Sequence, residues 1–230
     1  MAPGDSTVPI SIQESLFLRG LSPAEVTAIL NASMRRQFPA RTTITHQGTR
    51  ADDFYLLLEG RARYFFETPN GKKVLLMWMV PGEILGGMSV LDRPSRYLAS
   101  TEAVKDCTVL WWNRSTIRDL MREFPRLLEN ALSIAVSYID WFAETHAALI
   151  SRSAPERLAL VLSGLARLIG KQASGGLLLD ITNEELAGAA NITLYTASRI
   201  LSRWQKKGFI RKTRGMLQLR SPERLFLDLG

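Results

Sequence analysis

The chain has 230 residues, of which 46% are hydrophobic and 22% are charged, and this balance excludes a disordered or collagen-like protein. Its length allows one large domain or two small ones with apolar cores of their own, and we expect two. Cys107 is the single cysteine, so no internal disulfide forms, and no Cys/His cluster has the spacing of a metal site. No apolar run approaches the roughly 18 residues of a membrane span, and residues 1–10 lack the pattern of an export signal. We therefore expect a cytoplasmic protein that binds neither a metal nor a membrane.

The net charge of +7 comes entirely from the last third of the chain. Residues 1–150 hold 16 Lys/Arg and 16 Asp/Glu, whereas residues 151–230 hold 13 and 6. Residues 199–220 contain eight basic side chains and no acidic one. Such a one-sided basic segment is typical of a surface that meets nucleic-acid phosphates; a solvated helix face is the alternative, and the surrounding pattern decides between them.

A short helix followed by short strands is predicted in the first half of the chain. The segment from Ser22 to Glu25 is a capping box with proline in the first turn, and it begins a helix that runs to Leu30. Over residues 41–113, apolar runs alternate with turn residues, which is typical of a barrel or roll. Between two such runs, Asn70-Gly71 predicts a hairpin with a type I′ turn, because both residues tolerate positive φ.

A long helix with two apolar stripes is predicted next. One stripe recurs at alternating spacings of four and three residues, which is the a/d spacing of a coiled coil, and a second runs from Leu127 to Trp141. Two apolar faces need two partners, so we predict the strand domain on one side and the same helix of a second subunit on the other; a helix buried within a monomer is the alternative. The predicted dimer residues are Leu128, Leu132, Ala135, Ile139, Phe142, His146 and Leu149.

The last third of the chain has the pattern of a helix-turn-helix with a wing. A capping box at residues 153–156 begins a helix to about Gly170, and the break at 150–152 is the predicted hinge. After a turn at 174–176, a capping box at Thr182 begins a short helix, Asn191 occupies a left-handed turn position, and Thr193 caps a second helix. The basic residues 209–219 then form a hairpin, or wing.

In helix-turn-helix proteins, the N-terminal end of the second helix enters the major groove of DNA. The predicted base-reading residues there are Leu194, Tyr195, Ser198 and Arg199, with Arg199 the reader of guanine through two hydrogen bonds. Contacts with the DNA backbone are predicted for Thr182, Thr193, Arg203, Lys206, Lys207, Arg211, Lys212 and Arg214.

Over residues 18–219 the chain resembles the Crp/Fnr family of bacterial transcription regulators. The segments that carry the resemblance are 18–23, 55–60, the cassette Gly82-Glu83-Ile84-Leu85-Gly86, 181–187 and 198–201. The resemblance implies an α+β protein with an N-terminal double-stranded β-helix, or jelly-roll-like β-roll, in residues 1–124. It implies a dimerisation helix and hinge in residues 125–152 and a winged helix-turn-helix in residues 153–230.

The same resemblance implies a homodimer that binds a two-fold symmetric DNA site and an effector that binds in the roll against the long helix. If the protein is an activator, RNA polymerase is a further partner. Effector binding would re-pack the paired helices and reorient the DNA-reading domains.

The effector site departs from the family members that bind cyclic nucleotides. Those members place a glutamate for the ribose after the second cassette glycine, and further on an arginine followed by serine or threonine for the phosphate. Here Gly87, Tyr97 and Leu98 stand at these positions, and Arg96 lies one residue early. We therefore predict an effector other than cyclic AMP, such as an aromatic or fatty carboxylate in an apolar pocket. The candidate effector-binding residues are Gly82, Glu83, Ile84, Leu85, Gly86, Gly87, Met88, Ser89, Arg96, Tyr97, Tyr138 and Phe142.

Other sensing chemistries and functions are less favoured. One cysteine excludes the iron–sulfur branch of the family, and haem would need His46, His146 or Cys107 as its axial ligand. His146 on the dimer seam could respond to pH, whereas the simpler interpretation is a histidine near the exposed end of a coiled coil. Trp111 and Trp112 must point to opposite faces of their strand.

A constitutive dimeric DNA-binding protein with a vestigial roll is the alternative function. No catalytic motif supports an enzyme.

Overall fold

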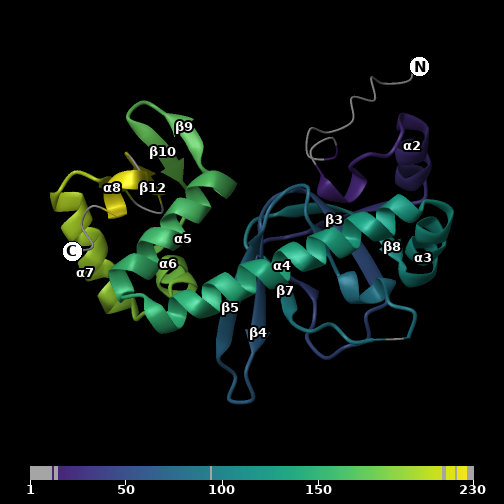
Figure 1. Cartoon of the computed structure of the whole chain (residues 1–230), viewed down its shortest axis with the longest axis horizontal. Coiled ribbons are helices and arrows are strands. Elements are labelled where there is room, and N and C mark those ends of the chain that lie inside the picture. Colours follow the sequence, from purple (N-terminus) through teal and green to yellow (C-terminus); the bar gives the residue numbers. More distant parts are fainter. Residues whose placement is uncertain (1–11, 13–14, 94, 214–215, 221, 227–230) are drawn as a thin grey trace. The chain divides into compact units, whose positions relative to one another are not determined.

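The computed structural model describes residues 12, 15–93, 95–213, 216–220 and 222–226 (Figure 1). The chain divides into two compact units, one up to Asp140 and one from Trp141. The division falls within a single long helix, α4 (Pro125–Ser151). The predicted three-part division at residues 124 and 152 stays a prediction. Among the described helices, none is both long and apolar enough to cross a membrane.

The first unit is the predicted strand roll, built from two four-stranded antiparallel sheets. One sheet has the order β1-β8-β3-β6 and the other the order β2-β7-β4-β5. The strands are β1 (Met34–Phe38), β2 (Thr43–Thr45), β3 (Asp53–Glu59), β4 (Ala62–Glu67), β5 (Lys73–Met79), β6 (Ile84–Leu85), β7 (Ser100–Ala103) and β8 (Cys107–Asn113). The helical segments are η1 (Leu16–Leu18), α2 (Pro23–Asn31), η2 (Gly87–Val90), α3 (Arg114–Glu123) and α4.

The central strands β3 and β8 are buried on both faces. On one face, Phe54 and Trp112 belong to an apolar cluster with residues of α2, α3 and α4. On the other face, Tyr55 and Leu57 belong to the cluster between the two sheets, and Trp111 packs against it. The prediction that the two tryptophans point to opposite faces is therefore confirmed. The roll thus has one core between its sheets and a second core beneath its helices.

The β4–β5 hairpin is confirmed, but its predicted type I′ turn is wrong. Strand pairing ends at Glu67 and Lys73, so the loop spans residues 68–72. The Thr68 backbone N–H donates to the Lys72 carbonyl at 3.0 Å, and the Gly71 N–H donates to the Thr68 carbonyl at 2.8 Å. Gly71 has a positive φ of 77°, whereas Asn70 does not have a positive φ, so the two residues do not form a type I′ turn. The longer loop, closed by Thr68, removes the need for two left-handed residues.

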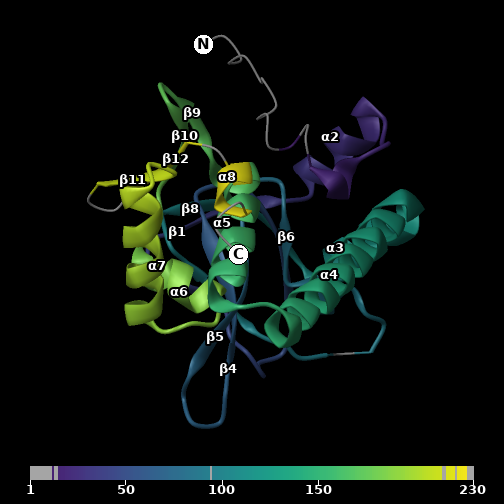
Figure 2. The same cartoon turned by 60° about the vertical axis from the view of Figure 1, so that its left-hand side comes forward.

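The second unit contains a helix-turn-helix and a small sheet (Figure 2). The helices α6 and α7 pack against each other and against α5. The sheet has the order β11-β12-β10-β9, so the wing hairpin pairs with an earlier hairpin. The elements are α5 (Ala154–Ile169), β9 (Lys171–Ala173), β10 (Gly176–Leu179), α6 (Asn183–Ala189), α7 (Leu194–Lys206), β11 (Ile210–Thr213), β12 (Met216–Leu219) and α8 (Pro222–Phe226).

Local signals account for the helix starts. The capping boxes at Ser22, Ser153 and Thr182 are all present, each with its glutamate bonded back to the capping residue. Asn191 has the predicted left-handed conformation, with φ 48°. The hairpin of β9 and β10 was not predicted, because the exposed residues of β9 carry no apolar alternation. Its turn coincides with the predicted one at residues 174–176.

Candidate nucleic-acid interface and effector site

The helix α7 presents one buried and one exposed face. Its Thr193 cap accepts a hydrogen bond from the Thr196 N–H at 3.1 Å, which ties the start of the helix to the turn. The buried residues are the predicted ones: Ala197, Ile200, Leu201 and Trp204. Because these positions anchor the helix in the domain, the N-terminal end is left open to solvent. There Leu194 is 51% and Tyr195 77% exposed, and Arg199 is also exposed.

Ser198 differs from the sequence-based expectation. Unlike the other three predicted base-reading residues, which are exposed, it is half-buried. Its Oγ accepts a hydrogen bond from Nδ2 of Asn183, the first residue of α6, at 3.3 Å. Sequence reasoning placed Asn183 within a capping box and gave it no functional role. The pairing joins residues 15 positions apart, so no local pattern could have revealed it.

Basic side chains continue from α7 into the wing. Arg203, Lys206 and Lys207 are exposed at the C-terminal end of α7, and Arg211 is exposed on β11. Lys212 is half-buried, and this loss of solvation lowers the pKa of its ammonium. The predicted wing hairpin is confirmed by the pairing of β11 with β12. Arg214 lies outside the described residues.

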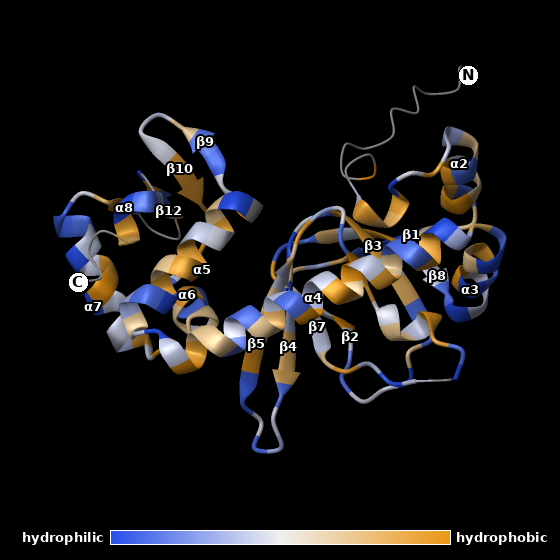
Figure 3. Ribbon diagram, in the orientation of Figure 1, coloured by the Kyte–Doolittle hydropathy of each residue, from blue (hydrophilic) through white to orange (hydrophobic). Residues whose placement is uncertain are grey.

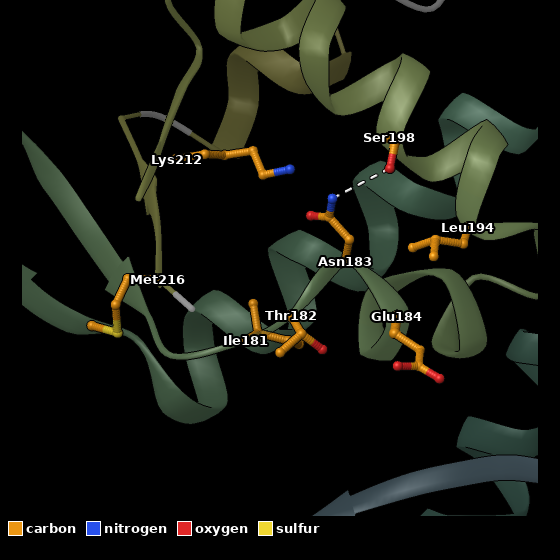
Figure 4. A pocket seen from close by; sticks show the side chains of 8 residues that line it. All are labelled: Ile181, Thr182, Asn183, Glu184, Leu194, Ser198, Lys212 and Met216. Carbon is orange, nitrogen blue, oxygen red and sulfur yellow. Dashed lines mark hydrogen bonds between the residues drawn. The ribbon is translucent and has the colours of Figure 1, made fainter. Parts of the chain in front are cut away.

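A cleft of about 420 Å³ lies between the helix-turn-helix and the wing (Figure 4). The helices and the residues just before α6 form one side, and the wing forms the other with Lys212 and Met216. In the close-up, the Lys212 side chain extends toward the hydrogen bond between Asn183 and Ser198. The lining residues are Ile181, Thr182, Asn183, Glu184, Leu194, Ser198, Lys212 and Met216. The predicted backbone and base contacts Thr182, Leu194, Ser198 and Lys212 therefore meet in one hollow.

The glycine cassette of the roll bends tightly around β3. Gly82 has φ 94°, and its N–H donates to the Leu57 carbonyl at 2.8 Å. Gly86 has φ 80°, and a Cβ at this position would collide with the carbonyl oxygen of Asp53. Ile84 and Leu85 between them are buried, and the Ser89 hydroxyl that follows is buried without a hydrogen-bond partner among the described residues. Met88 is half-buried and Gly87 is exposed.

Tyr97 is bonded to the backbone of β3. Its hydroxyl donates to the Asp53 carbonyl at 2.9 Å and accepts from the Asp53 N–H at 3.1 Å. Burial raises the pKa of Tyr97 to about 12. The neighbouring Leu98 is 63% exposed, and Arg96 is exposed with its guanidinium donating to the Gly48 carbonyl at 2.6 Å. Tyr97 is therefore neutral near pH 7 and its hydroxyl is already engaged.

Glu83 and Tyr138 are half-buried polar effector candidates of the roll and α4. Glu83 accepts a hydrogen bond from the Val80 N–H at 2.8 Å, and burial raises the pKa of its carboxyl group to about 7. The Tyr138 hydroxyl is buried without a hydrogen-bond partner among the described residues. Burial raises the pKa of Tyr138, and the nearby Glu83 and Tyr64 raise it further. Phe142, farther along α4, is half-buried and contacts the Trp141 ring at 5.1 Å between centroids.

The two apolar stripes of α4 have different surroundings. Leu127, Ala131 and Ile134 are buried, and Tyr138 packs against the same cluster, as expected for the stripe that faces the roll. Trp141 was assigned to that stripe, but it is exposed. On the other stripe, Leu132 is 64% and Ile139 65% exposed, and Leu128, Ala135, His146 and Leu149 are exposed as well. Figure 3 shows hydrophobic residues at intervals along this helix.

The candidate haem ligands differ in their surroundings. His46 lies in the roll after β2 and is exposed, and His146 is exposed on α4. Cys107 is buried in β8, where its Sγ contacts the Lys105 carbonyl at 3.2 Å, and burial raises the pKa of the thiol. No group of three or more potential ligands for a metal ion occurs among the described residues.

A roll with a glycine cassette, followed by a winged helix-turn-helix with an exposed basic face, defines a DNA-binding transcription regulator. The family model of the cyclic nucleotide-binding domain matches residues 35–124, and that of the Crp-like helix-turn-helix domain matches residues 156–226. The chain belongs to the Crp/Fnr family of transcription regulators, as its sequence indicated.

Relatives and solved structures match nearly the whole chain. The cyclic AMP receptor protein of Thermus thermophilus is 31% identical over 207 residues, which cover 90% of this chain and 93% of that protein. The CRP-like cAMP-activated global transcriptional regulator of Mycobacterium tuberculosis is 25% identical over 211 residues, 91% of this chain and 94% of that protein. The solved structure of CLP, a c-di-GMP responsive global regulator of Xanthomonas campestris, matches with a TM-score of 0.75 and 18% identity. That match covers 87% of this chain and 100% of the other.

Proposed function

We propose that the protein is a homodimeric transcription regulator that reads a two-fold symmetric operator and responds to a small effector other than cyclic AMP. The observation that carries the DNA-reading part is the exposed N-terminal end of α7, which stands beside the basic wing. The base readers lie at a helix end and are flanked by Lys and Arg, and DNA recognition uses these two kinds of contact for different purposes. Phosphate contacts supply the affinity, and contacts in the major groove supply the sequence preference.

Arg199 is the proposed guanine reader, and the neighbouring Leu194 and Tyr195 present apolar surface suited to thymine methyl groups. The basic residues of α7 and β11 are the proposed phosphate contacts, which bind any sequence alike. We therefore expect mutation of Arg199 to reduce sequence preference, and mutation of the phosphate contacts to reduce overall affinity.

The exposed stripe of α4 supports the proposed homodimer. Burying a large aliphatic side chain stabilises by about 1.5–3 kcal/mol, and the exposure of Leu128, Leu132, Ile139 and Leu149 to water is unfavourable for an isolated subunit. The a/d spacing suits a parallel pair of helices related by a two-fold axis. Such a symmetric pair would present two reading helices, which is the reason to expect a two-fold symmetric operator.

The case against cyclic AMP rests on Gly87 and Tyr97. Relatives with the words cyclic AMP or cAMP in their names include the Thermus and Mycobacterium proteins. In this chain, the phosphate position holds Tyr97, whose hydroxyl is bonded to the backbone of Asp53, and the ribose position holds Gly87. Loss of a charge-assisted partner costs about 1.5–3 kcal/mol, so an anionic cyclic phosphate is a poor match. An aromatic or fatty carboxylate near Arg96 is the effector class that we propose in its place.

A constitutive regulator with a ligand-free roll is the second candidate function. The lost cassette residues favour it, because Gly87 and Tyr97 stand where the cyclic nucleotide-binding members have the partners of the ribose and the phosphate. The two candidates differ in what the ligand-free protein does. A constitutive protein binds its operator fully without any added metabolite, whereas a sensor gains affinity or loses it when its effector binds.

The test begins with native mass spectrometry of the purified protein, followed by operator titration. A dimer with a reproducible small adduct supports the effector-controlled regulator, and the adduct identifies the effector class. A clean dimer that binds operator with nanomolar affinity, and whose thermal stability no carboxylate or cyclic nucleotide changes, supports the constitutive regulator. A protein that stays monomeric, or that binds all duplexes equally, contradicts both. Transcription with purified RNA polymerase then separates an activator from a repressor.

A further inference from the structure

Asn183 contacts Ser198 across the two helices of the helix-turn-helix (Figure 4). Asn183 is the first residue of α6, and its Nδ2 donates a hydrogen bond to Ser198 Oγ at 3.3 Å. Both side chains line the cleft of about 420 Å³ that the wing closes with Lys212 and Met216. The contact therefore lies on the surface that faces DNA in the proposed function.

The direction of this hydrogen bond limits what the Ser198 hydroxyl can offer to DNA. A serine hydroxyl has one hydrogen to donate and two lone pairs that accept. Asn183 occupies a lone pair, and within the described part of the chain the Ser198 hydroxyl donates to no other group. Other helical serines do donate, each to the carbonyl four residues earlier: Ser133, Ser137 and Ser151 of α4. The hydrogen of Ser198 is thus available to a partner outside the protein.

We propose that Asn183 is a positioning residue that makes Ser198 a hydrogen-bond donor toward the DNA base it meets. This inference rests on the proposed DNA-reading function. In the major groove, guanine offers acceptors at N7 and O6 and thymine at O4, whereas cytosine offers only a donor at N4. A Ser198 hydroxyl held by Asn183 therefore favours guanine or thymine over cytosine at one position of each half-site. A single neutral hydrogen bond supports a preference of about five- to tenfold.

Asn183→Asp reverses the hydrogen-bond direction with little change of shape. A carboxylate only accepts, so the Ser198 hydroxyl would donate to the introduced carboxylate and turn its lone pairs toward the base. The change suits the local structure, because the first turn of α6 already holds Glu184 and Glu185 and favours negative charge. Gln205→Glu is the matched control, since it makes the same amide-to-carboxylate change at an exposed position near the other end of α7.

The experiment selects bound duplexes from a randomised library at one salt concentration and compares base preferences at each position. We expect Asn183→Asp to change the preference at one position of each half-site from guanine or thymine toward cytosine or adenine, by about fivefold or more. Gln205→Glu should lower overall affinity without changing any preference. In a Ser198→Ala background, Asn183→Asp should change no preference either, which separates positioning through Ser198 from a direct contact.

The failures of this inference and of the proposed function are distinguishable. If the wild-type protein enriches no sequence, the proposed function is wrong and the inference fails with it. If the wild-type protein enriches a sequence and Asn183→Asp enriches the same one at reduced affinity, Asn183 is only a backbone contact and the inference alone is wrong. A change that persists in the Ser198→Ala background also overturns it. Thermal unfolding of each variant shows that the domain remains folded in the comparison.

Discussion

Truncation of Leu132 on the exposed stripe of α4 tests the proposed dimer. Leu132→Ala removes three carbon atoms, which are worth about 0.8 kcal/mol each when fully buried. Because 64% of the residue is exposed in the single chain, pairing can bury at most about two-thirds of this area. The loss is therefore about 1.5 kcal/mol per subunit and about 3 kcal/mol per dimer. Since 1.4 kcal/mol is a factor of ten, the dimer Kd should rise about 100-fold.

Sedimentation velocity over a range of concentrations measures this Kd. Leu91→Ala is the matched control, because Leu91 is also an exposed leucine, at 46%, but follows η2 in the roll and is not part of α4. It should leave the Kd unchanged. Both variants should unfold at nearly the wild-type temperature as monomers, since neither side chain belongs to a core. If Leu132→Ala dimerises as tightly as wild type and Leu91→Ala, the exposed stripe is not the dimer seam and the reasoning is wrong.

Three further changes follow from the structure. Arg199→Ala should relax base preference while it retains most of the salt dependence of binding. Titrations with operator and scrambled duplexes at several salt concentrations check this. If the ratio of the two affinities is unchanged, Arg199 is not the base reader. Glu83→Gln should remove a pH dependence of stability: burial raises the carboxyl pKa from 4.5 to about 7, so the wild-type free energy of unfolding should fall by up to about 3 kcal/mol as the pH rises through this range. Urea unfolding at pH 5 and pH 8 measures this fall in the free energy of unfolding. An equal change between the two pH values in wild type and Glu83→Gln would refute the prediction. Gly86→Ala should lower the free energy of unfolding by about 2 kcal/mol or more, and the unfolding temperature with it, because the added Cβ meets the Asp53 carbonyl and the backbone is left-handed. Gly87→Ala is its control, because a Cβ there meets nothing within 4 Å and its φ lies outside the positive range.

The sequence predicted those features whose signals are local. The capping box at Thr182, the left-handed Asn191 and the buried face of α7 each depend on residues within one or two turns of chain. The order of roll, long helix and winged helix-turn-helix then indicated the family. The alternation at Trp111 and Trp112 followed from strand geometry alone, and the structure agrees with it.

Features that depend on contacts distant in sequence were missed. The hydrogen bond between Asn183 and Ser198 needs the angle at which two helices meet, and the half-burial of Ser198 follows from the same packing. The turn at Asn70-Gly71 depended on how far the pairing of β4 and β5 extends, which Thr68 decides. The raised pKa of Glu83 required knowledge of what buries it. None of these quantities is encoded in a short window of residues.

The two stripes of α4 have no residue in common, so the residues that pack against the roll and the residues proposed to form the dimer can be changed independently. Substitutions in the buried stripe at Leu127, Ala131 and Ile134 alter the fit of the helix to the roll. Substitutions on the exposed stripe beside it leave that core untouched. Leu132 and Ile139 could therefore be replaced by acidic residues in one copy and by basic residues in another without repacking either roll. Engineered pairs of this kind would form a heterodimer with two different reading helices, and this heterodimer would bind an operator whose two half-sites differ in sequence.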